Sequence, residues 1–404
     1  MRILLLAEGL TSGIGGIAIH ASELGAALVG RGYDVTLVSP EQFTGRRVVT
    51  RWRATRRPCP TAASLRAWEL PIIWTPRRAF TARQVEQRWK PWLHRLIAST
   101  RADVVHWHGI DVDSMLTRSL PRGPAGVFTN HSSQFLAHAA DDARMAVAPF
   151  AHATQIITPS GELAERTIAG GIPARRVHII PNGVDVARYK PDVDARRRFR
   201  NRHGIVDDAV VTIAARRMVE KNGVVYLAQA AAELDRTLRQ RVVLCFAGDA
   251  AGTNPSYMAR VRAACEDLRH VDVRWLGWIS NRDMPEALAA ADIAALPSLV
   301  EATSLAGLEA MASGCALLGT RVGGIPELID DGVTGRLVPP ADPHGMADAW
   351  RELIEDAATR RRLASAARAR VEREFSWGRI AERTERVYQL AVAAKEDVDV
   401  CVAR

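Results

Sequence analysis

The chain has 404 residues, of which 48% are apolar and 25% charged, so it can form two domains that each bury a core. No apolar run approaches the ~20 residues of a membrane span, which argues against an integral membrane protein. The net charge of +9 is concentrated in residues 43–95, which contain thirteen Lys and Arg and only two acids. The five cysteines lack a Cys-x-x-Cys spacing, so we expect reduced thiols in a cytoplasmic protein and no structural zinc.

The N-terminal residues predict a strand, a glycine-rich turn, a helix and a second strand. Residues 2–7 are apolar only briefly, which favours a buried strand over a signal peptide, and residues 17–30 and 34–39 continue the pattern. Gly15 and Gly16 would let a ligand approach the backbone, although a tight turn without a ligand remains the alternative. The spacing is not Gly-x-Gly-x-x-Gly, so a nicotinamide site is not favoured.

Residues 43–95 are the least regular part of the chain and combine arginines, tryptophans and prolines. Three interpretations remain open. The segment is a solvated face with packed tryptophans, a site for a phosphorylated or acidic acceptor, or a peripheral attachment to an anionic membrane. Nucleic-acid binding is not favoured, because no recognised module accompanies the basic residues.

Further strands are predicted at residues 103–108, 126–132 and 155–160, and the first two end on histidines at a strand edge where functional side chains gather in such sheets. We expect His106 and His108 to point to opposite faces of their strand and therefore not to pair as metal ligands. These predictions complete a first α/β unit.

The C-terminal half repeats the alternation of strands and helices. Strands are predicted within residues 177–185, 210–216, 242–249 and 271–279, and helices at 224–234, 283–291, 343–355, 359–372 and 377–394. Three Asp-x-Asp pairs occur, at Asp111/Asp113, Asp192/Asp194 and Asp397/Asp399, and we expect the last two to lie in a linker and a tail. We do not expect any of them to bind a metal.

The stretch from residue 292 to Gly314 is the most informative part of the sequence. It predicts a buried strand, a loop that carries Glu301, and a helix that contains Glu309 and ends at Gly314. Open α/β sheets bind ligands in such loops, and a helix N-terminus suits phosphate. Two carboxylates beside that phosphate are suited to accept hydrogen bonds from the hydroxyls of a sugar or ribose.

This stretch, followed by Gly323-Gly-Ile-Pro-Glu327 and Gly335-Arg-Leu-Val-Pro-Pro340, resembles the Glu-x7-Glu motif of retaining glycosyltransferases of family 4, the glycosyl transferases group 1. The resemblance implies the GT-B fold, with two Rossmann-like α/β/α domains that face a central cleft and a C-terminal helix that crosses back to the N-terminal domain. The domains would be an acceptor-binding domain at 1–185, completed by 377–404, and a donor-binding domain at 205–376.

The resemblance also implies a role for each matching residue. Trp278 either stacks on the nucleotide base or packs in the core. The implied site comprises catalytic His131 and Glu301; Arg216, Lys221, Gly15, Gly16, Ser304 and Leu305 for the donor diphosphate; Glu309 for the ribose; Gly277, Trp278 and Ile279 for the base; and Ala302 and Thr303 for the donor sugar. The family usually has Glu-Gly-Phe-Gly where this chain has Glu301-Ala-Thr-Ser304, so the donor sugar is not implied.

The implied activity is transfer of a sugar from a UDP- or GDP-sugar to a hydroxyl acceptor in bacterial glycan, glycolipid or natural-product biosynthesis. Anomeric configuration would be retained, and no metal or cofactor would be needed beyond the nucleotide sugar. The alternatives are a GT-B epimerase or phosphorylase and an inactive sugar-nucleotide-binding protein. We expect a cytoplasmic monomer or homodimer, with membrane contact through residues 43–95 left open.

Overall fold

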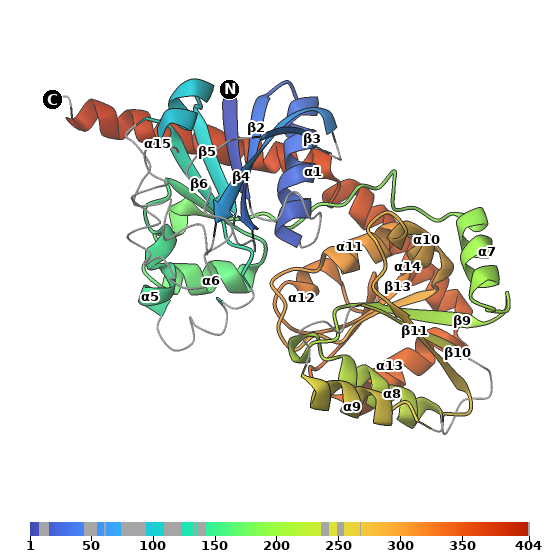
Figure 1. Cartoon of the computed structure of the whole chain (residues 1–404). Helices are drawn as coiled ribbons and strands as arrows, with labels where there is room; N and C mark the ends of the chain where they lie inside the picture. Colours follow the sequence, from blue (N-terminus) through green and yellow to red (C-terminus); the bar gives the residue numbers. More distant parts are fainter. Residues whose placement is uncertain are drawn as a thin grey trace. The chain divides into compact units, whose positions relative to one another are not determined.

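The computed structural model describes residues 1–7, 16–43, 55–59, 62–73, 94–108, 123–132, 135, 143–235, 242–248, 254–266 and 268–402. The chain forms two units: one is Met1–Gly183 with Trp377–Arg404, and the other is Val184–Ser376 (Figure 1). The predicted architecture of two Rossmann-like domains is confirmed, because each unit has a largely parallel sheet with helices packed against it. In the part of the chain described, no helix is both long and apolar enough to cross a membrane.

The first unit contains an eight-stranded sheet in the order β3-β4-β2-β1-β5-β6-β7-β8. Every pairing is parallel except that of β3 with β4, which is antiparallel. The strands are β1 (Arg2–Ala7), β2 (Asp34–Phe43), β3 (Thr55–Cys59), β4 (Ala62–Ile73), β5 (Val104–His108), β6 (Ala125–Thr129), β7 (Gln155–Thr158) and β8 (Val177–Ile179). Within residues 43–95, the described residues 55–59 and 62–73 are therefore more regular than predicted, since β3 and β4 extend the sheet at its edge.

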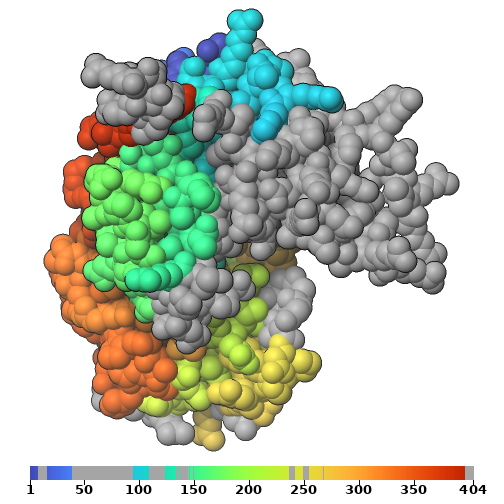
Figure 2. All heavy atoms as spheres, turned by 90° about the vertical axis from the view of Figure 1, so that its left-hand side faces the viewer, coloured from blue at the N-terminus to red at the C-terminus, as the bar shows by residue number. Residues whose placement is uncertain are grey.

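Helices α1 (Gly16–Gly30) and α15 (Trp377–Val402) pack against each other and against this sheet, where their apolar side chains join one core with those of β1, β2, β5 and β6. Figure 2 shows α15 in red beside the green segment that carries β7, α6 (Gly161–Ala169) and β8. The predicted return of the C-terminal helix to the N-terminal unit is confirmed. Asp397 and Asp399 lie in α15 rather than in a tail.

The second unit has a six-stranded parallel sheet in the order β11-β10-β9-β12-β13-β14. In chain order within the unit this is 3-2-1-4-5-6, the arrangement of dinucleotide-binding folds. The strands are β9 (Val210–Ala215), β10 (Val242–Ala247), β11 (Val271–Gly277), β12 (Ile293–Leu296), β13 (Ala316–Thr320) and β14 (Gly335–Val338). β9, β10, β12 and β13 are almost wholly buried, as strands covered on both faces must be, which explains their apolar sequences.

Helices cover both faces of the second sheet. One face packs against α8 (Val224–Asp235), α9 (Pro255–Ala263) and α13 (Pro343–Glu355), and the other carries α10 (Met284–Ala290), α11 (Leu305–Ala312), α12 (Ile325–Leu328) and α14 (Ala357–Glu374), with α7 (Val193–Arg202) packed on α10. Asp192 precedes α7 and caps it, because its side chain accepts a hydrogen bond from the Ala195 N–H, and Asp194 lies in the first turn of the helix. The first of these acids is thus explained by helix capping.

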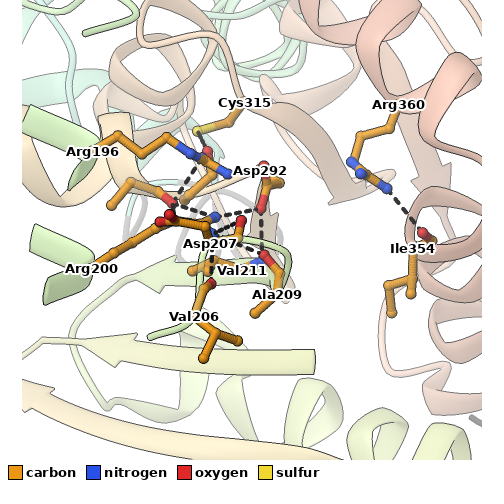
Figure 3. Close-up of polar contacts among 12 residues, drawn as sticks. Arg196, Arg200, Val206, Asp207, Ala209, Val211, Asp292, Cys315, Ile354 and Arg360 are labelled. Atoms are coloured by element: carbon orange, nitrogen blue, oxygen red, sulfur yellow. Dashed lines mark hydrogen bonds and ion pairs between the residues drawn. The ribbon is translucent and has the colours of Figure 1, made fainter. Parts of the chain in front are cut away.

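A buried ion pair connects α7 to the amino end of this sheet. Figure 3 shows Arg196 and Arg200 directed at Asp292, the residue before β12. Arg200 is 1% exposed, and its Nη2 lies 2.9 Å from Asp292 Oδ2, which also accepts the Val211 N–H at 2.8 Å. This network is at the opposite end of the strands from the loops described next, so we interpret it as structural.

Candidate functional site

The second sheet reverses its strand order between β9 and β12. Ligands of open α/β sheets bind outside the carboxyl ends of the strands at such a switch point. Arg216 directly follows β9, and Glu301 lies in the loop between β12 and α11. The fold therefore brings together two predicted site residues that are 85 positions apart in the sequence.

Arg216 is the centre of a buried polar cluster. Its side chain is only 9% exposed and forms an ion pair with Glu301, which is 15% exposed. Nη2 also donates to Ser298 Oγ at 2.7 Å and to Asn222 Oδ1 at 3.2 Å, and Nη1 donates to Ser304 Oγ at 3.2 Å. Nε is buried and has no partner among the described residues. Arg216 is therefore a positioned cation and not a solvated surface charge.

Backbone contacts hold the surrounding loops together. The Leu299 N–H donates to the Lys221 carbonyl at 2.8 Å, which ties the loop after β9 to the loop after β12. Gly223 has a left-handed φ of +63°, and a Cβ there would lie 1.8 Å from the Pro297 carbonyl oxygen. The glycine after the Lys221-Asn222 pair is thus required by close backbone approach.

Lys221 lies within the same charge environment. Burial lowers its pKa, Glu301 opposes this effect, and the neighbouring Arg217 and Arg216 lower the pKa further. Because Arg216 and Arg217 both lower the pKa of Lys221, positive charge is concentrated around Lys221, and a bound anion would neutralise it. A diphosphate is an anion of the appropriate charge.

Helix α11 begins beside this cluster. Ser304 caps the helix by accepting the Gly307 N–H at 3.1 Å, and Leu305 is the first helical residue. Ala302 is buried, whereas the Thr303 hydroxyl is buried without a partner in the described part of the chain. Glu309 lies within α11 and is half-buried. The predicted contacts of these residues with a donor remain predictions.

The three residues predicted to contact the base lie at the end of β11, the edge strand two positions from β9 in the sheet. Gly277 ends the strand with φ +65°, and Trp278 follows it. The Trp278 side chain is 60% exposed, so the alternative that it packs in the core is wrong. Ile279 packs partly against the core of the unit.

In the first unit, four histidines gather at the corresponding switch point, between β1 and β5. His106 and His108 lie on β5, His131 lies just beyond β6, and His20 lies on α1. The expectation that His106 and His108 face opposite ways is wrong: their ring centroids are 4.2 Å apart. Alternate residues of a strand share a face, so positions 106 and 108 must point the same way.

The histidine cluster is held by hydrogen bonds. His20 Nδ1 lies 2.8 Å from Asn182 Oδ1, and His108 Nδ1 lies 3.1 Å from His131 Nε2. Burial lowers the pKa of His20 to about 4 and holds the pKa values of the other three well below the usual range, with charge from neighbouring histidines adding to the effect. His131 is therefore neutral at physiological pH and acts as a hydrogen-bonding group rather than as a cation.

Some predicted residues lie outside the described structure, and some important ones were not predicted. Gly15 falls outside the described residues, whereas Gly16 is the first residue of α1. Sequence reasoning did not assign a role to Ser298, His20, Asn182 or Asn222. The one available signal was His20 itself, a polar side chain on the buried face of an apolar helix.

Two family models together cover most of the chain. The model described as Glycosyltransferase Family 4 matches residues 14–188, and the model described as Glycosyl transferases group 1 matches residues 195–370. The chain belongs to glycosyltransferase family 4. Sequence relatives that are named glycosyltransferases agree with this assignment.

Alpha-maltose-1-phosphate synthase of Mycobacterium tuberculosis is one of the curated relatives of this family 4 glycosyltransferase and is 34% identical to it over 228 residues. That match covers 54% of this chain and 57% of the relative. D-inositol 3-phosphate glycosyltransferase of Saccharomonospora viridis is 34% identical over 222 residues, which cover 54% of this chain and 51% of the relative. The matches span a little over half the length of these relatives.

Solved structures resemble the chain over nearly its whole length. Sucrose-phosphate synthase from Thermosynechococcus elongatus matches with a TM-score of 0.75 at 20% identity, covering 97% of this chain and 99% of the other. Anabaena HepE, solved in complex with UDP-glucose, matches with a TM-score of 0.74 at 20% identity, covering 96% and 100%. At these identities the likeness shows the fold, which is GT-B.

Proposed function

We propose that this glycosyltransferase moves a sugar from a nucleoside-diphosphate sugar to a hydroxyl acceptor with retention of anomeric configuration and without a metal. The observation that carries the proposal is the buried Arg216 cluster at the switch point of the second sheet. It combines a fixed cation, a second cation at Lys221, and a carboxylate at Glu301. These are the groups needed to bind a diphosphate and a sugar at the same time.

Each group has a distinct role in the proposal. Arg216 and Lys221 bind the donor diphosphate and stabilise the charge that develops as it leaves. Ser304, Leu305 and their helix N-terminus offer backbone N–H groups to the same phosphates. The carboxylate of Glu309 accepts hydrogen bonds from the ribose diol.

Glu301 is assigned to the hydroxyls of the donor sugar and not to nucleophilic attack. Retaining hydrolases use a free carboxylate nucleophile, but here the carboxylate is ion-paired with a buried guanidinium, which stabilises its charge. We therefore favour attack of the acceptor on the same face that the diphosphate leaves, with the diphosphate accepting the acceptor proton. Neutral His131 then contributes a hydrogen bond to the sugar, and the protein acts by positioning and electrostatics.

The acceptor is a separate question. Two curated relatives carry phosphate in the names of their product or acceptor, maltose 1-phosphate and inositol 3-phosphate. Together with the basic composition of residues 43–95, these names favour a phosphorylated hydroxyl compound as the first acceptor class to test. The proposed reaction is therefore transfer of a hexosyl group from the donor, and a panel of acceptors identifies the compound that receives it.

The donor is tested by thermal unfolding with UDP, GDP and ADP, because a ligand of the native state raises Tm. We expect one nucleotide to raise Tm and Arg216→Met to abolish the rise. Arg197 on α7 has a side chain that is 64% exposed and takes no part in the Arg216 cluster, so Arg197→Met is the matched control and should keep most of the shift. An Arg216→Met protein that keeps the full nucleotide shift contradicts the assignment.

The reaction is tested with the matching nucleotide sugar and a panel of phosphorylated and neutral acceptors. Mass spectrometry of the products separates transfer from epimerisation, phosphorolysis and simple binding, and proton NMR of the new linkage reports the anomeric configuration. Full activity in EDTA is expected. Inversion of configuration, or loss of activity in EDTA that Mn²⁺ restores, would contradict the corresponding part of the proposal.

A further inference from the structure

Three histidines of the first unit have the arrangement of a metal-ligand set. One ring nitrogen from each of His20, His108 and His131 lies within 4.8 Å of the nitrogens of the other two. The three rings come from α1, β5 and the segment after β6, so secondary structure supports at least two of them. Two ligands of a tetrahedral zinc with 2.0–2.1 Å bonds are about 3.3 Å apart, so the ring nitrogens would have to approach one another by up to about 1.5 Å to close the site.

The neighbouring His106 is a structural histidine, and its hydrogen bonds provide a comparison for the other three. Its Nδ1 lies 2.7 Å from the Tyr388 hydroxyl, and its Nε2 lies 2.7 Å from Thr129 Oγ1. Both ring nitrogens are therefore engaged, which leaves no lone pair for a metal. In the described part of the chain, His20, His108 and His131 each form a hydrogen bond through one ring nitrogen only: His20 Nδ1 with Asn182, and His108 Nδ1 with His131 Nε2. A metal bound by the three rings would replace the bond between His108 and His131.

His20 has its tautomer set by a second residue. Its Nδ1 lies 2.8 Å from the amide oxygen of Asn182, and because that oxygen can only accept, the Nδ1 carries the proton. The lone pair is then on Nε2. Metal-binding histidines are typically oriented in this way, by donation of the other ring N–H to a carbonyl or carboxylate.

His108 supplies an independent observation. Its side chain is fully buried, and its Nε2 has no hydrogen-bond partner in the described part of the chain. An unpartnered buried polar atom destabilises a fold and requires an explanation. A bound cation at His108 would satisfy this atom or release it to reorient toward the other two rings.

We propose that His20, His108 and His131 form a binding site for a divalent first-row transition metal, with Zn²⁺ as the reference ion. Imidazole nitrogens suit Zn²⁺, Cu²⁺ and Ni²⁺, and three neutral imidazoles leave a coordination position for water.

The site has a consequence for catalysis that rests on the proposed function. A metal that takes a lone pair of His131 removes the residue proposed to contact the donor sugar. The ion is therefore an inhibitor of transfer and not a cofactor for it. Inhibition by micromolar Zn²⁺ and its reversal by EDTA are the expected signs.

Metal binding is measured directly on the full-length protein, freed of affinity tag and of metal by EDTA and dialysis. Co²⁺ should give the intense visible absorption of a low-coordinate nitrogen site, and Zn²⁺ should displace it with one equivalent. His20→Ala should weaken Co²⁺ binding at least about 100-fold, and Asn182→Ala, which removes only the orienting oxygen, by about 10–100-fold. Circular dichroism verifies that each variant is folded.

His178→Ala is the matched control. This histidine belongs to the same unit but lies on β8, bonded through Nε2 to Gln155 Oε1 at 2.8 Å, outside the three-histidine set. The variant should bind Co²⁺ as the unaltered protein does. The proposal is overturned if the unaltered protein gives no Co²⁺ spectrum, or if His20→Ala binds as tightly as His178→Ala. Both readouts are independent of enzyme activity, so a failed transferase assay leaves this test intact.

Discussion

Gly323 offers a sharp test of how the Glu301 loop is held. Its φ is +52°, a left-handed conformation, and the Gly324 N–H donates to the Glu301 carbonyl at 3.2 Å. A Cβ at position 323 would lie 1.5 Å from the Glu301 carbonyl oxygen. Gly323→Ala must therefore displace the backbone of the proposed catalytic carboxylate.

The expected loss of stability in Gly323→Ala has two separate causes. A left-handed conformation costs an alanine about 1–2 kcal/mol, and forcing extra volume into a packed contact costs about 1–3 kcal/mol more. Relief of the contact requires a shift of about 1.5 Å, since real Cβ contacts are not shorter than about 3.0 Å. Because a misplacement of about 1 Å can reduce the rate by about 100-fold, kcat should fall by at least that factor.

Gly332→Ala is the control for the cost of the left-handed backbone conformation alone. Its φ is +77°, but the nearest atom to its Cβ would be the flexible Arg336 Nη1 at 3.2 Å. Thermal unfolding should place the Tm of Gly323→Ala below that of Gly332→Ala by about 2–12 °C, at about 2–4 °C per kcal/mol for a unit of this size. Only Gly323→Ala should lose activity at saturating donor.

Equal Tm values for the two variants would refute the inferred backbone contact. If Gly323→Ala is destabilised but fully active, the inferred backbone contact stands, and the role of Glu301 in positioning the donor sugar is refuted.

Three further results are expected. Glu301→Ala should mainly lower kcat, whereas Glu309→Ala should raise the donor KM more than it lowers kcat, and steady-state kinetics that show unchanged turnover for Glu301→Ala would sink its assignment. Asp292→Asn leaves the buried Arg200 without its carboxylate and should cost about 3–5 kcal/mol in urea unfolding, while Asp272→Asn, in a pair that is about 40% exposed, should cost under about 1 kcal/mol. Burial raises the pKa of Asp235, but the backbone N–H groups of residues 269–271 outweigh it and lower the pKa overall. Asp235→Asn should therefore cost about 1–3 kcal/mol at pH 7. The difference from the unaltered protein should shrink as pH falls below about 4, where the unfolded carboxyl is protonated; a difference that is constant with pH would contradict this reasoning.

The sequence predicted the regular elements of the second unit well, for a physical reason. Strands of a parallel sheet covered on both faces must be apolar throughout, so β9, β10, β12 and β13 stand out as apolar runs. Helices such as α13 and α14 carry their own capping signals, Asp342 and Asp356. Local chemistry of this kind is present in the sequence itself.

The weaker predictions concerned features that depend on partners distant in the chain. β3 and β4 lie in a segment rich in arginine and proline, and neither the pairing of β4 with β2 nor that of β3 with β4 at the sheet edge gave a periodic signal. The prediction that His106 and His108 lie on opposite faces of β5 was wrong, because residues two positions apart in a strand lie on the same face. The two Trp278 alternatives were equal in the sequence, and its exposure in the structure excludes packing in the core, while stacking on a base stays a prediction.

For the candidate site, the sequence by itself determined which residues to consider, because Glu301, Glu309, Arg216 and Lys221 match the motifs of the family. Only the tertiary structure showed that Arg216 and Glu301 form a buried ion pair and that Arg216 also donates to Ser298 and Ser304, since strand order, and not sequence distance, decides which loops meet. The histidine cluster depends on folding in the same way: His20, His108 and His131 are more than 110 positions apart at their extremes, and they meet because α1, β5 and β6 converge at one edge of a sheet. Burial at that edge, a property of the fold alone, keeps these imidazoles neutral and gives them their chemistry.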